Sequence, residues 1–167
     1  MNVQVLMLRQ DDPKKCTAAK LVKFGLAKRV SKTRSDTIIL DPFAKQTLLK
    51  NDAMVANSIT GIDCSWNLVE DTFAKQFLGI PRKLPPLLAG NPVNYSKLNK
   101  LTTVEAISAT AFILGYEDLA KSLLDKFNWG HTFYELNEHL LKDYSKLVSE
   151  DEIPPLLHEY GFASKLK

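Results

Sequence analysis

The chain has 167 residues and a net charge of +3, and its hydrophobic content of 45% and charged content of 25% are ordinary for one globular domain or two small lobes. No apolar run approaches the roughly 18–20 residues that a membrane-spanning helix needs, so we predict a cytoplasmic protein without membrane contact. The two cysteines, Cys16 and Cys64, form no CxxC pair, which argues against a structural zinc site or a disulfide framework.

Short apolar runs alternate with helical patterns in the first part of the chain. The apolar runs predict strands at 3–8, 37–40, 58–62 and 87–89. The spacing of apolar residues predicts one helix at 16–24, where Gly25 would end it, and another at 68–78. Strands that alternate with helices in this way indicate an α/β fold with a parallel sheet.

The second part of the chain shows helical patterns and no strand pattern. Thr102 and Glu105 form a capping box, in which the threonine caps a helix and the glutamate reaches back to the cap amide. Helices are predicted at 104–114, 118–127, 133–147 and 153–160. We therefore predict an α/β lobe over 1–90 that carries a basic segment, followed by an all-helical lobe over 91–167.

The charges are distributed unevenly along the chain. Between Lys14 and Arg34 there are eight cations and no acid, whereas between Glu117 and Glu159 there are ten acids and four cations. A solvated basic face could account for the first cluster. Eight cations without a neighbouring acid favour a surface that binds a nucleic acid. The acidic end of the chain would repel a nucleic acid.

Polar residues follow several of the predicted strands. In a parallel sheet, ligands collect at the carboxyl ends of the strands, and here the segments 11–17, 63–67 and 91–95 occupy those positions. Asp63 directly follows an apolar run, and a partly desolvated carboxylate there needs a cationic or donor partner. The residue types leave an alternative open, in which Asp63 caps the next helix and Trp66 packs in the core.

The sequence lacks the GxGxxG and GxxxxGK[ST] motifs, so dinucleotide and P-loop functions lose support. His131, Glu135 and His139 fall four residues apart and could ligate a metal, but the spacing is not HExxH and a polar helix face explains it. We predict no metal site. A set of aromatic residues is expected in the core rather than in a base-stacking platform: Phe127, Trp129, Phe133 and Tyr134.

Five segments resemble, in order, motifs of the small-subunit ribosomal RNA aminocarboxypropyltransferases. They are DPKKCTAAKL at 12–21, DCSW at 63–66, RKLPPLLAGNPVNY at 82–95, KLTTVEA at 100–106 and FNWG at 127–130. The likeness covers nearly the whole chain. The departures are mild, because Ala18 and Ala19 stand where the family often has glycine or other small residues, and Pro86 stands where an aromatic is common.

The resemblance implies a SPOUT-like α/β domain with a deep trefoil knot, followed by helices that complete the site. It also implies that the chain transfers the 3-amino-3-carboxypropyl group of S-adenosylmethionine to a pseudouridine, often N1-methylated, of small-subunit rRNA during ribosome biogenesis. The expected partner is that rRNA or a pre-ribosomal particle, and we expect a monomer. A SPOUT-class RNA methyltransferase and a non-catalytic rRNA-binding assembly factor remain as alternatives.

The resemblance and the residue types together assign roles. Asp63 is the predicted catalytic residue, which could hold the donor's amino group, stabilise the sulfonium or accept a proton. Donor binding is assigned to Thr17, Ile62, Asp63, Trp66, Leu84, Asn99 and Thr103. Contacts to RNA phosphates are assigned to Lys14, Lys15, Lys20, Lys23, Arg29 and Arg82.

Overall fold

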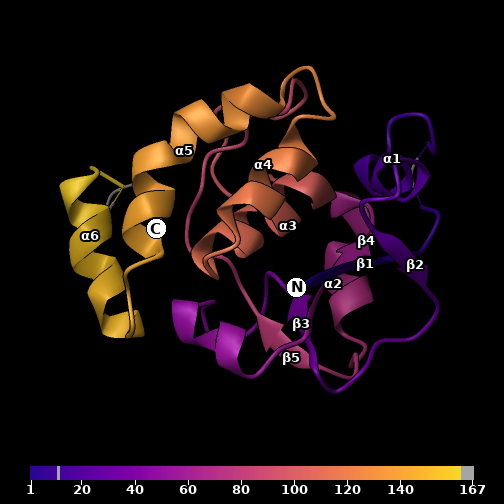
Figure 1. Ribbon diagram of the computed structural model, residues 1–167, viewed down its shortest axis with the longest axis horizontal. Coiled ribbons are helices and arrows are strands. Elements are labelled where there is room, and N and C mark those ends of the chain that lie inside the picture. Colours follow the sequence, from indigo (N-terminus) through magenta and orange to yellow (C-terminus); the bar gives the residue numbers. More distant parts are fainter. Residues whose placement is uncertain (11, 163–167) are drawn as a thin grey trace.

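A parallel sheet of five strands, in the order β2-β1-β4-β3-β5, forms the centre of the computed structural model, which describes residues 1–10 and 12–162. Each neighbouring pair of strands runs parallel, so the carboxyl ends lie along one edge of the sheet (Figure 1). The strands are β1 (Asn2–Met7), β2 (Lys28–Val30), β3 (Thr37–Leu40), β4 (Ser58–Asp63) and β5 (Ile80–Arg82). The α/β fold with a parallel sheet is confirmed.

Helices lie between several of the strands, and after a loop over residues 83–102 they make up most of the remaining described chain. The α-helices are α1 (Thr17–Lys23), α2 (Val69–Phe73), α3 (Thr103–Ile113), α4 (Glu117–Leu124), α5 (Gly130–Tyr144) and α6 (Ile153–Glu159). Short 3-10 helices are η1 (Lys50–Met54), η2 (Trp66–Leu68) and η3 (Glu150–Glu152). None of the helices in residues 1–10 and 12–162 is long and apolar enough to span a bilayer.

The central strands form where the sequence has continuous apolar runs. All four residues of β3 are buried, as are the first five of β4, because both faces of these strands are covered. Met7 pairs with Asp63 across β1 and β4, and Leu40 pairs with Gly61 across β3 and β4. The predicted strands at 3–8, 37–40 and 58–62 are therefore confirmed, with shifts of one residue at their ends.

The predicted strand at 87–89 is wrong. Leu88 makes only an isolated antiparallel bridge to Leu98, outside the sheet. Leu87 and Ala89 are buried and Leu88 is partly buried. The amides of Leu87 and Leu88 donate to the side chains of Asn99 and Asn137, and the amide of Ala89 donates to the carbonyl of Lys97. A buried loop with its backbone satisfied in this way has the same apolar pattern as a strand.

The two edge strands were missed because they are short. β2 has no buried residue and β5 contains a proline, so neither shows the apolar run of a central strand. The predicted helix at 68–78 is also too long, since the turn of η2 leads into α2 and that helix ends at Phe73. The predicted helices in the second part of the chain are confirmed as α3 to α6.

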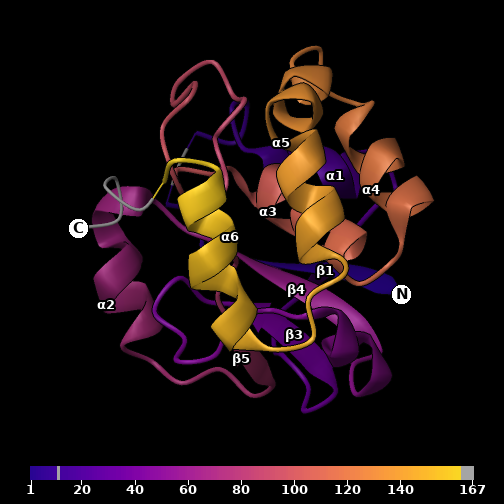
Figure 2. The ribbon, with the colours of Figure 1, turned by 90° about the vertical axis from the view of Figure 1, so that its left-hand side faces the viewer.

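Helix α3 is buried on all sides and packs directly on the central strand. Nine of its eleven residues are buried, and a Cβ added to Gly61 of β4 would lie 2.9 Å from Cγ2 of Thr103. Figures 1 and 2 show α4 and α5 outside α3, whereas α2 lies apart from these helices. The helix that carries the capping box therefore begins against the carboxyl end of β4.

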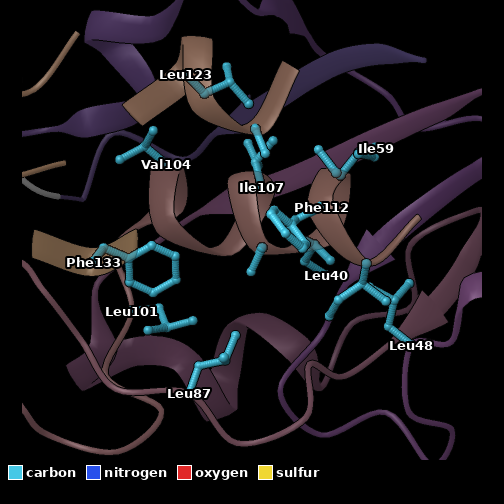
Figure 3. Packing of buried hydrophobic residues seen from close by; sticks show 14 of the residues in the cluster. Leu40, Leu48, Ile59, Leu87, Leu101, Val104, Ile107, Phe112, Leu123 and Phe133 are labelled. Atoms are coloured by element: carbon cyan, nitrogen blue, oxygen red, sulfur yellow. The ribbon is translucent and has the colours of Figure 1, made fainter. Parts of the chain in front are cut away.

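One hydrophobic cluster joins the sheet to the later helices. Figure 3 shows Ile107 and Phe112 of α3 packed in one group with Leu123 of α4 and the sheet residues Leu40 and Ile59. A smaller cluster on the opposite face of the sheet contains Leu6, Ile39 and Ile62, with Phe73 and Phe77 packed against it. The helices after residue 91 thus share a core with the strands, and a lobe boundary near residue 90 stays a prediction.

Candidate functional site

A cavity of about 840 Å³ opens at the carboxyl edge of the sheet. Its walls come from the loops after β1, β3, β4 and β5 and from the start of α3. The seven residues predicted to bind a donor all line this cavity, and they are Thr17, Ile62, Asp63, Trp66, Leu84, Asn99 and Thr103. Segments that are far apart in the sequence therefore meet at one site, as the strand ends predicted.

Asp63 ends β4 and is held at the cavity wall by two donors. The thiol of Cys16 donates to Oδ2 at 3.1 Å, and the hydroxyl of Thr103 donates to Oδ1 at 3.3 Å. The pKa of the Cys16 thiol is raised to about 11, mainly by burial and to a smaller extent by the hydrogen bond to Asp63 and its negative charge. The carboxylate is partly buried, so a cationic group in the cavity would be attracted to it strongly.

The alternative in which Asp63 caps the next helix and Trp66 packs in the core is wrong. Ser65 caps η2, because its side chain accepts the amide of Asn67. The amide of Ser65 in turn donates to Oε1 of Gln10 at 3.0 Å, which joins the loops after β1 and β4. Trp66 is 38% exposed, and Nζ of Lys100 lies 4.8 Å from the centre of its ring. Its indole is therefore a wall of the cavity.

Thr17 links the two helices that begin at the cavity. Its Oγ1 accepts the amide of Val104 at 3.2 Å, so the first turn of α1 is joined to the first turn of α3. Cys16 caps α1, since its sulfur accepts the amide of Ala19 at 3.3 Å. The position of Thr17 at a helix start is confirmed, and its contact with a donor carboxylate stays a prediction.

Asn99 supports the loop that forms another wall. It has a left-handed backbone with φ of 60°. Its side chain accepts the amide of Leu87 at 3.2 Å, and its own amide donates to the carbonyl of Leu87 at 2.8 Å. Leu84 and Ile62 add apolar surface to the same cavity. Both the side chain and the main chain of Asn99 therefore bond to the backbone of Leu87. These bonds hold the loop that forms this wall of the cavity.

Buried polar residues that the sequence analysis did not assign to the site fix this loop. The carboxylate of Glu105 is fully buried and accepts the amides of Gly90 at 2.7 Å and Thr102 at 2.7 Å. Asn137 of α5 bonds both the amide and the carbonyl of Leu88 at 2.8 Å. The capping box gave a signal for Glu105, whereas no sequence pattern marked Asn137.

Asp41 is a carboxylate in the cavity that the sequence analysis missed. Asp41 directly follows β3 and lines the site, and its Oδ1 accepts the amide of Phe43 at 2.8 Å. Burial raises the pKa of this carboxyl above its ordinary range. Its signal in the sequence was its position at the end of a strand, the same signal that singled out Asp63.

The six predicted RNA contacts fall into three groups. Lys15 and Arg82 line the cavity, whereas Lys14, Lys23 and Arg29 are exposed outside it. The guanidinium of Arg82 is bonded to Asp52, with Nη2 to Oδ1 at 2.9 Å and Nε to Oδ1 at 3.0 Å, and its side chain is 17% exposed. Arg82 therefore has a structural partner, and its contact with RNA stays a prediction.

The remaining predicted cation has an aromatic neighbour. Nζ of Lys20 lies 5.9 Å from the centre of the Phe127 ring. Phe127 and Phe133 are buried, and Trp129 and Tyr134 pack against the same cluster, so these aromatics belong to the core as predicted. In residues 1–10 and 12–162 the structure brings no three His, Cys, Asp or Glu side chains together as a metal site.

Two family models match the chain. The model described as "Ribosome biogenesis protein, C-terminal" matches residues 38–161. A second, described as a possible Fer4-like domain in RNase L inhibitor, matches residues 1–34. That segment contains one cysteine, Cys16, whereas ferredoxin-type clusters are held by several thiolates. The second match therefore indicates a similarity of sequence, because one cysteine does not supply the ligands of an iron–sulfur cluster.

Curated proteins and one solved structure are similar over almost the full length. A 16S rRNA aminocarboxypropyltransferase of Methanococcoides burtonii is 43% identical over 164 residues, which cover 95% of this chain and 94% of the relative. One of Thermoplasma volcanium is 46% identical over 161 residues, which cover 95% and 97%. The SAM-dependent rRNA:acp-transferase Tsr3 from Vulcanisaeta distributa matches with a TM-score of 0.86 at 37% identity, over 94% of this chain and 89% of that one. The chain belongs to the 16S rRNA aminocarboxypropyltransferase family.

Proposed function

We propose that this protein transfers the 3-amino-3-carboxypropyl group of S-adenosylmethionine to 16S rRNA. The observation that carries the proposal is the position of Asp63, a carboxylate fixed at the end of β4 inside a cavity lined by all seven predicted donor-binding residues. The curated relatives are named for this reaction. The solved relative is described as SAM-dependent.

The residues in the cavity fit this donor. Its volume of about 840 Å³ is at the upper end of the range for small-ligand sites, which allows for a donor and a nucleobase together. The carboxylate of Asp63 is complementary to the positive charge of an ammonium or sulfonium group. Trp66, Leu84 and Ile62 supply the apolar surface that an adenosine would need.

The reaction is a displacement at the γ-carbon of the donor's amino acid arm. S-adenosylmethionine supplies the alkyl group and a good leaving group, methylthioadenosine. A nitrogen of the uracil ring forms the new bond and loses its proton, so the protein's main contribution is to hold the two reactants in line. Asp63 would hold the donor's amino group, and the carboxylates that line the cavity and could accept the proton are Asp12, Asp41 and Asp63.

The RNA would approach over the basic segment between Lys14 and Arg34. Lys15 lines the cavity and Lys14, Lys23 and Arg29 are exposed, so their charges are available to the phosphates of a bound RNA. Lys20 is partly buried beside Phe127. The proposed target is a pseudouridine, often N1-methylated, and the proposed setting is ribosome biogenesis in the cytoplasm, where the protein acts as a monomer.

The resemblance also carries three finer inferences about architecture. We infer that the α/β part is a SPOUT-like trefoil knot, that it corresponds to residues 1–90, and that residues 91–167 form an all-helical lobe that completes the donor site. Support comes from the likeness to Tsr3 and from Asn99 and Thr103, which line the cavity from the second part. The last residues of that range, 163–167, lie outside the described part of the chain.

A double-label transfer assay tests the proposed reaction. The protein is incubated with rRNA that lacks the modification and with donor labelled either in the carboxyl group or in the methyl group. Carboxyl label that enters the RNA, with methyl label released as methylthioadenosine, is the expected result. Methyl label in the RNA would show a methyltransferase instead. No transfer of either label, with RNA still bound, would show an assembly factor.

A further inference from the structure

The carboxylate of Asp63 is held by donors from two different helices. Cys16, which caps α1, reaches Oδ2, and Thr103, the first residue of α3, reaches Oδ1. Each carboxylate oxygen therefore has a donor of its own. A carboxylate bonded in this way cannot rotate about its own axis without losing a bond, so the starts of α1 and α3 together set its direction.

We propose that Cys16 is a positioning residue for the transfer reaction, whose thiol acts with Thr103 to orient the carboxylate of Asp63 toward the donor. The inference rests on the proposed function, because it assumes that Asp63 faces S-adenosylmethionine.

The thiol needs protection because the cavity would hold an alkylating agent. Cys16 lines the cavity, and a thiolate there would compete with the RNA. Its sulfur would form a bond to the donor's γ-carbon, the bond from that carbon to the sulfonium would break, and methylthioadenosine would leave an S-alkylated, inactive protein. The thiolate, rather than the thiol, is the nucleophile in such reactions.

The surroundings of Cys16 keep its proton on the sulfur. Burial, assisted by the hydrogen bond to Asp63 and by its negative charge, raises the pKa of the thiol to about 11. The thiolate fraction at neutral pH is therefore lower by roughly a hundredfold than for an ordinary cysteine. The groups that face the thiol are Asp63 from β4 and the amide of Ala19 from α1, and Asp12 and Lys15 line the same cavity from the preceding loop.

A second role of Cys16 has to be separated from the proposed one. Its sulfur also caps α1 through the amide of Ala19, so Cys16→Ala removes a helix cap as well as a donor to Asp63. Serine can replace both interactions. The proposed role acts only through Asp63, whereas the cap acts on α1 whether or not Asp63 is present, and a double-mutant cycle distinguishes these cases.

The first experiment measures the affinity for S-adenosylmethionine by calorimetry. Cys16→Ala should weaken binding by about tenfold, the worth of a hydrogen bond to a charged group, and Cys16→Ser should restore most of it. In an Asp63→Ala background, Cys16→Ala should cause no further loss. Equal losses from Cys16→Ala in both backgrounds would show a purely structural role and overturn the proposal.

The second experiment needs neither donor nor RNA. Iodoacetamide labels the folded protein between pH 7 and 11, and mass spectrometry follows Cys16 separately from Cys64, since trypsin cleaves after Lys20 and Lys50 between them. Asp63→Asn should speed the labelling of Cys16 at pH 8 several-fold, because burial still raises the pKa of the thiol but the added effect of the Asp63 charge is gone. An unchanged pH profile would overturn the pairing. Failure of the wild-type protein to bind the donor would instead overturn the proposed function.

Discussion

Asn91 donates to the carboxylate of Glu105 twice, from its main-chain amide at 3.0 Å and from its side-chain amide at 2.8 Å. The amides of Gly90 and Thr102 donate to the same carboxylate, which is fully buried. Glu105 lies in the first turn of α3. One buried acid therefore fixes both ends of the loop between residues 90 and 102, and that loop forms a wall of the cavity.

Replacement of Glu105 by glutamine should destabilise the protein by about 2–4 kcal/mol, because an NH₂ group would then face the backbone amides that the carboxylate accepts. Urea denaturation measures the change. Glu117→Gln is the matched control, since Glu117 is exposed and bonded to Lys121 at 3.6 Å, and it should cost less than about 0.5 kcal/mol. Similar losses in the two variants would contradict the role of Glu105.

Asp63→Ala and Trp66→Ala should each weaken the binding of S-adenosylmethionine by about tenfold or more, because the first removes a charge complementary to the donor and the second removes an apolar wall. Both variants should stay folded, since Asp63 is only partly buried and Trp66 is 38% exposed. Calorimetry gives the affinities.

Tyr116→Ala is the matched control for Trp66→Ala. Tyr116 has a similar exposure, 37%, and precedes α4, outside the cavity. Its replacement should leave the affinity for the donor unchanged. If Trp66→Ala and Tyr116→Ala behave alike, or if both cavity variants bind the donor as tightly as the wild type, the site assignment is wrong.

The sequence predicted which residues line the cavity better than it predicted the loops that support them. Asp63 and Trp66 were found because they directly follow a strand with a clear apolar run, and strand ends in a parallel sheet meet at one edge. The partners of Glu105 could not be predicted beyond the capping box. Gly90 and Asn91 lie 15 and 14 residues away from Glu105. Hydrogen bonds between residues so far apart leave no periodic pattern in the sequence from which they could be predicted.

The error at 87–89 has the same physical origin. A strand and a buried loop both need apolar side chains, and they differ only in what satisfies the backbone. Here Asn137 supplies both a donor and an acceptor to Leu88. Because Asn137 lies on α5, 49 residues away along the chain, only the tertiary structure shows that its side chain replaces a neighbouring strand.

Lys15 and Arg82 should respond differently when RNA binding is measured against salt. Lys15→Gln should reduce the slope of log K against log salt by about 0.7–0.9, the contribution of one phosphate contact, and should leave the stability unchanged. Arg82→Gln should cost about 3 kcal/mol of stability, because it leaves Asp52 without its ion-pair partner. A changed slope in the Arg82 variant would show that this residue also meets a phosphate, and an unchanged slope for Lys15 would remove it from the interface.

Stability should fall at high pH through Tyr160. Its hydroxyl donates to Oδ2 of Asp143 at 2.7 Å, and burial followed by this bond raises the pKa of Tyr160 to about 12. An unfolded tyrosine titrates near about 10, so the folded state holds the proton more tightly. The stabilisation is therefore complete below about pH 10 and is lost as the pH rises toward 12.

Tyr160→Phe removes the titrating group and serves as the reference for this pH dependence. The difference in unfolding free energy between wild type and variant should be constant at neutral pH and should shrink between about pH 10 and 12. Burial, and Tyr160 after it, raises the pKa of Tyr144, and because burial remains in the variant, we expect that hydroxyl to keep its proton over this range in both proteins. Parallel curves over the whole range would contradict the prediction.

Gly90→Ala should be among the most damaging single substitutions in the loop. A Cβ at this position would lie 2.4 Å from the backbone nitrogen of Phe133 and 2.5 Å from its Cα. Because these are backbone atoms of α5, the loop would have to move away from the helix. That movement would disturb the bonds of Glu105 and Asn137 to the same loop. A loss of more than about 3 kcal/mol of stability is expected.

Gly115→Ala separates this close approach from the general cost of replacing a glycine. Gly115 has φ of +94°, and a Cβ there would meet nothing within 4 Å. Its replacement should cost only about 1 kcal/mol, the strain of a left-handed backbone for an L-residue.

Thermal unfolding and donor affinity are measured for both variants. Gly90→Ala should also weaken donor binding, because the displaced loop carries Asn91 and Val93 of the cavity wall, whereas Gly115→Ala should leave binding intact. Equal effects on both quantities would show that α5 does not hold the loop in place.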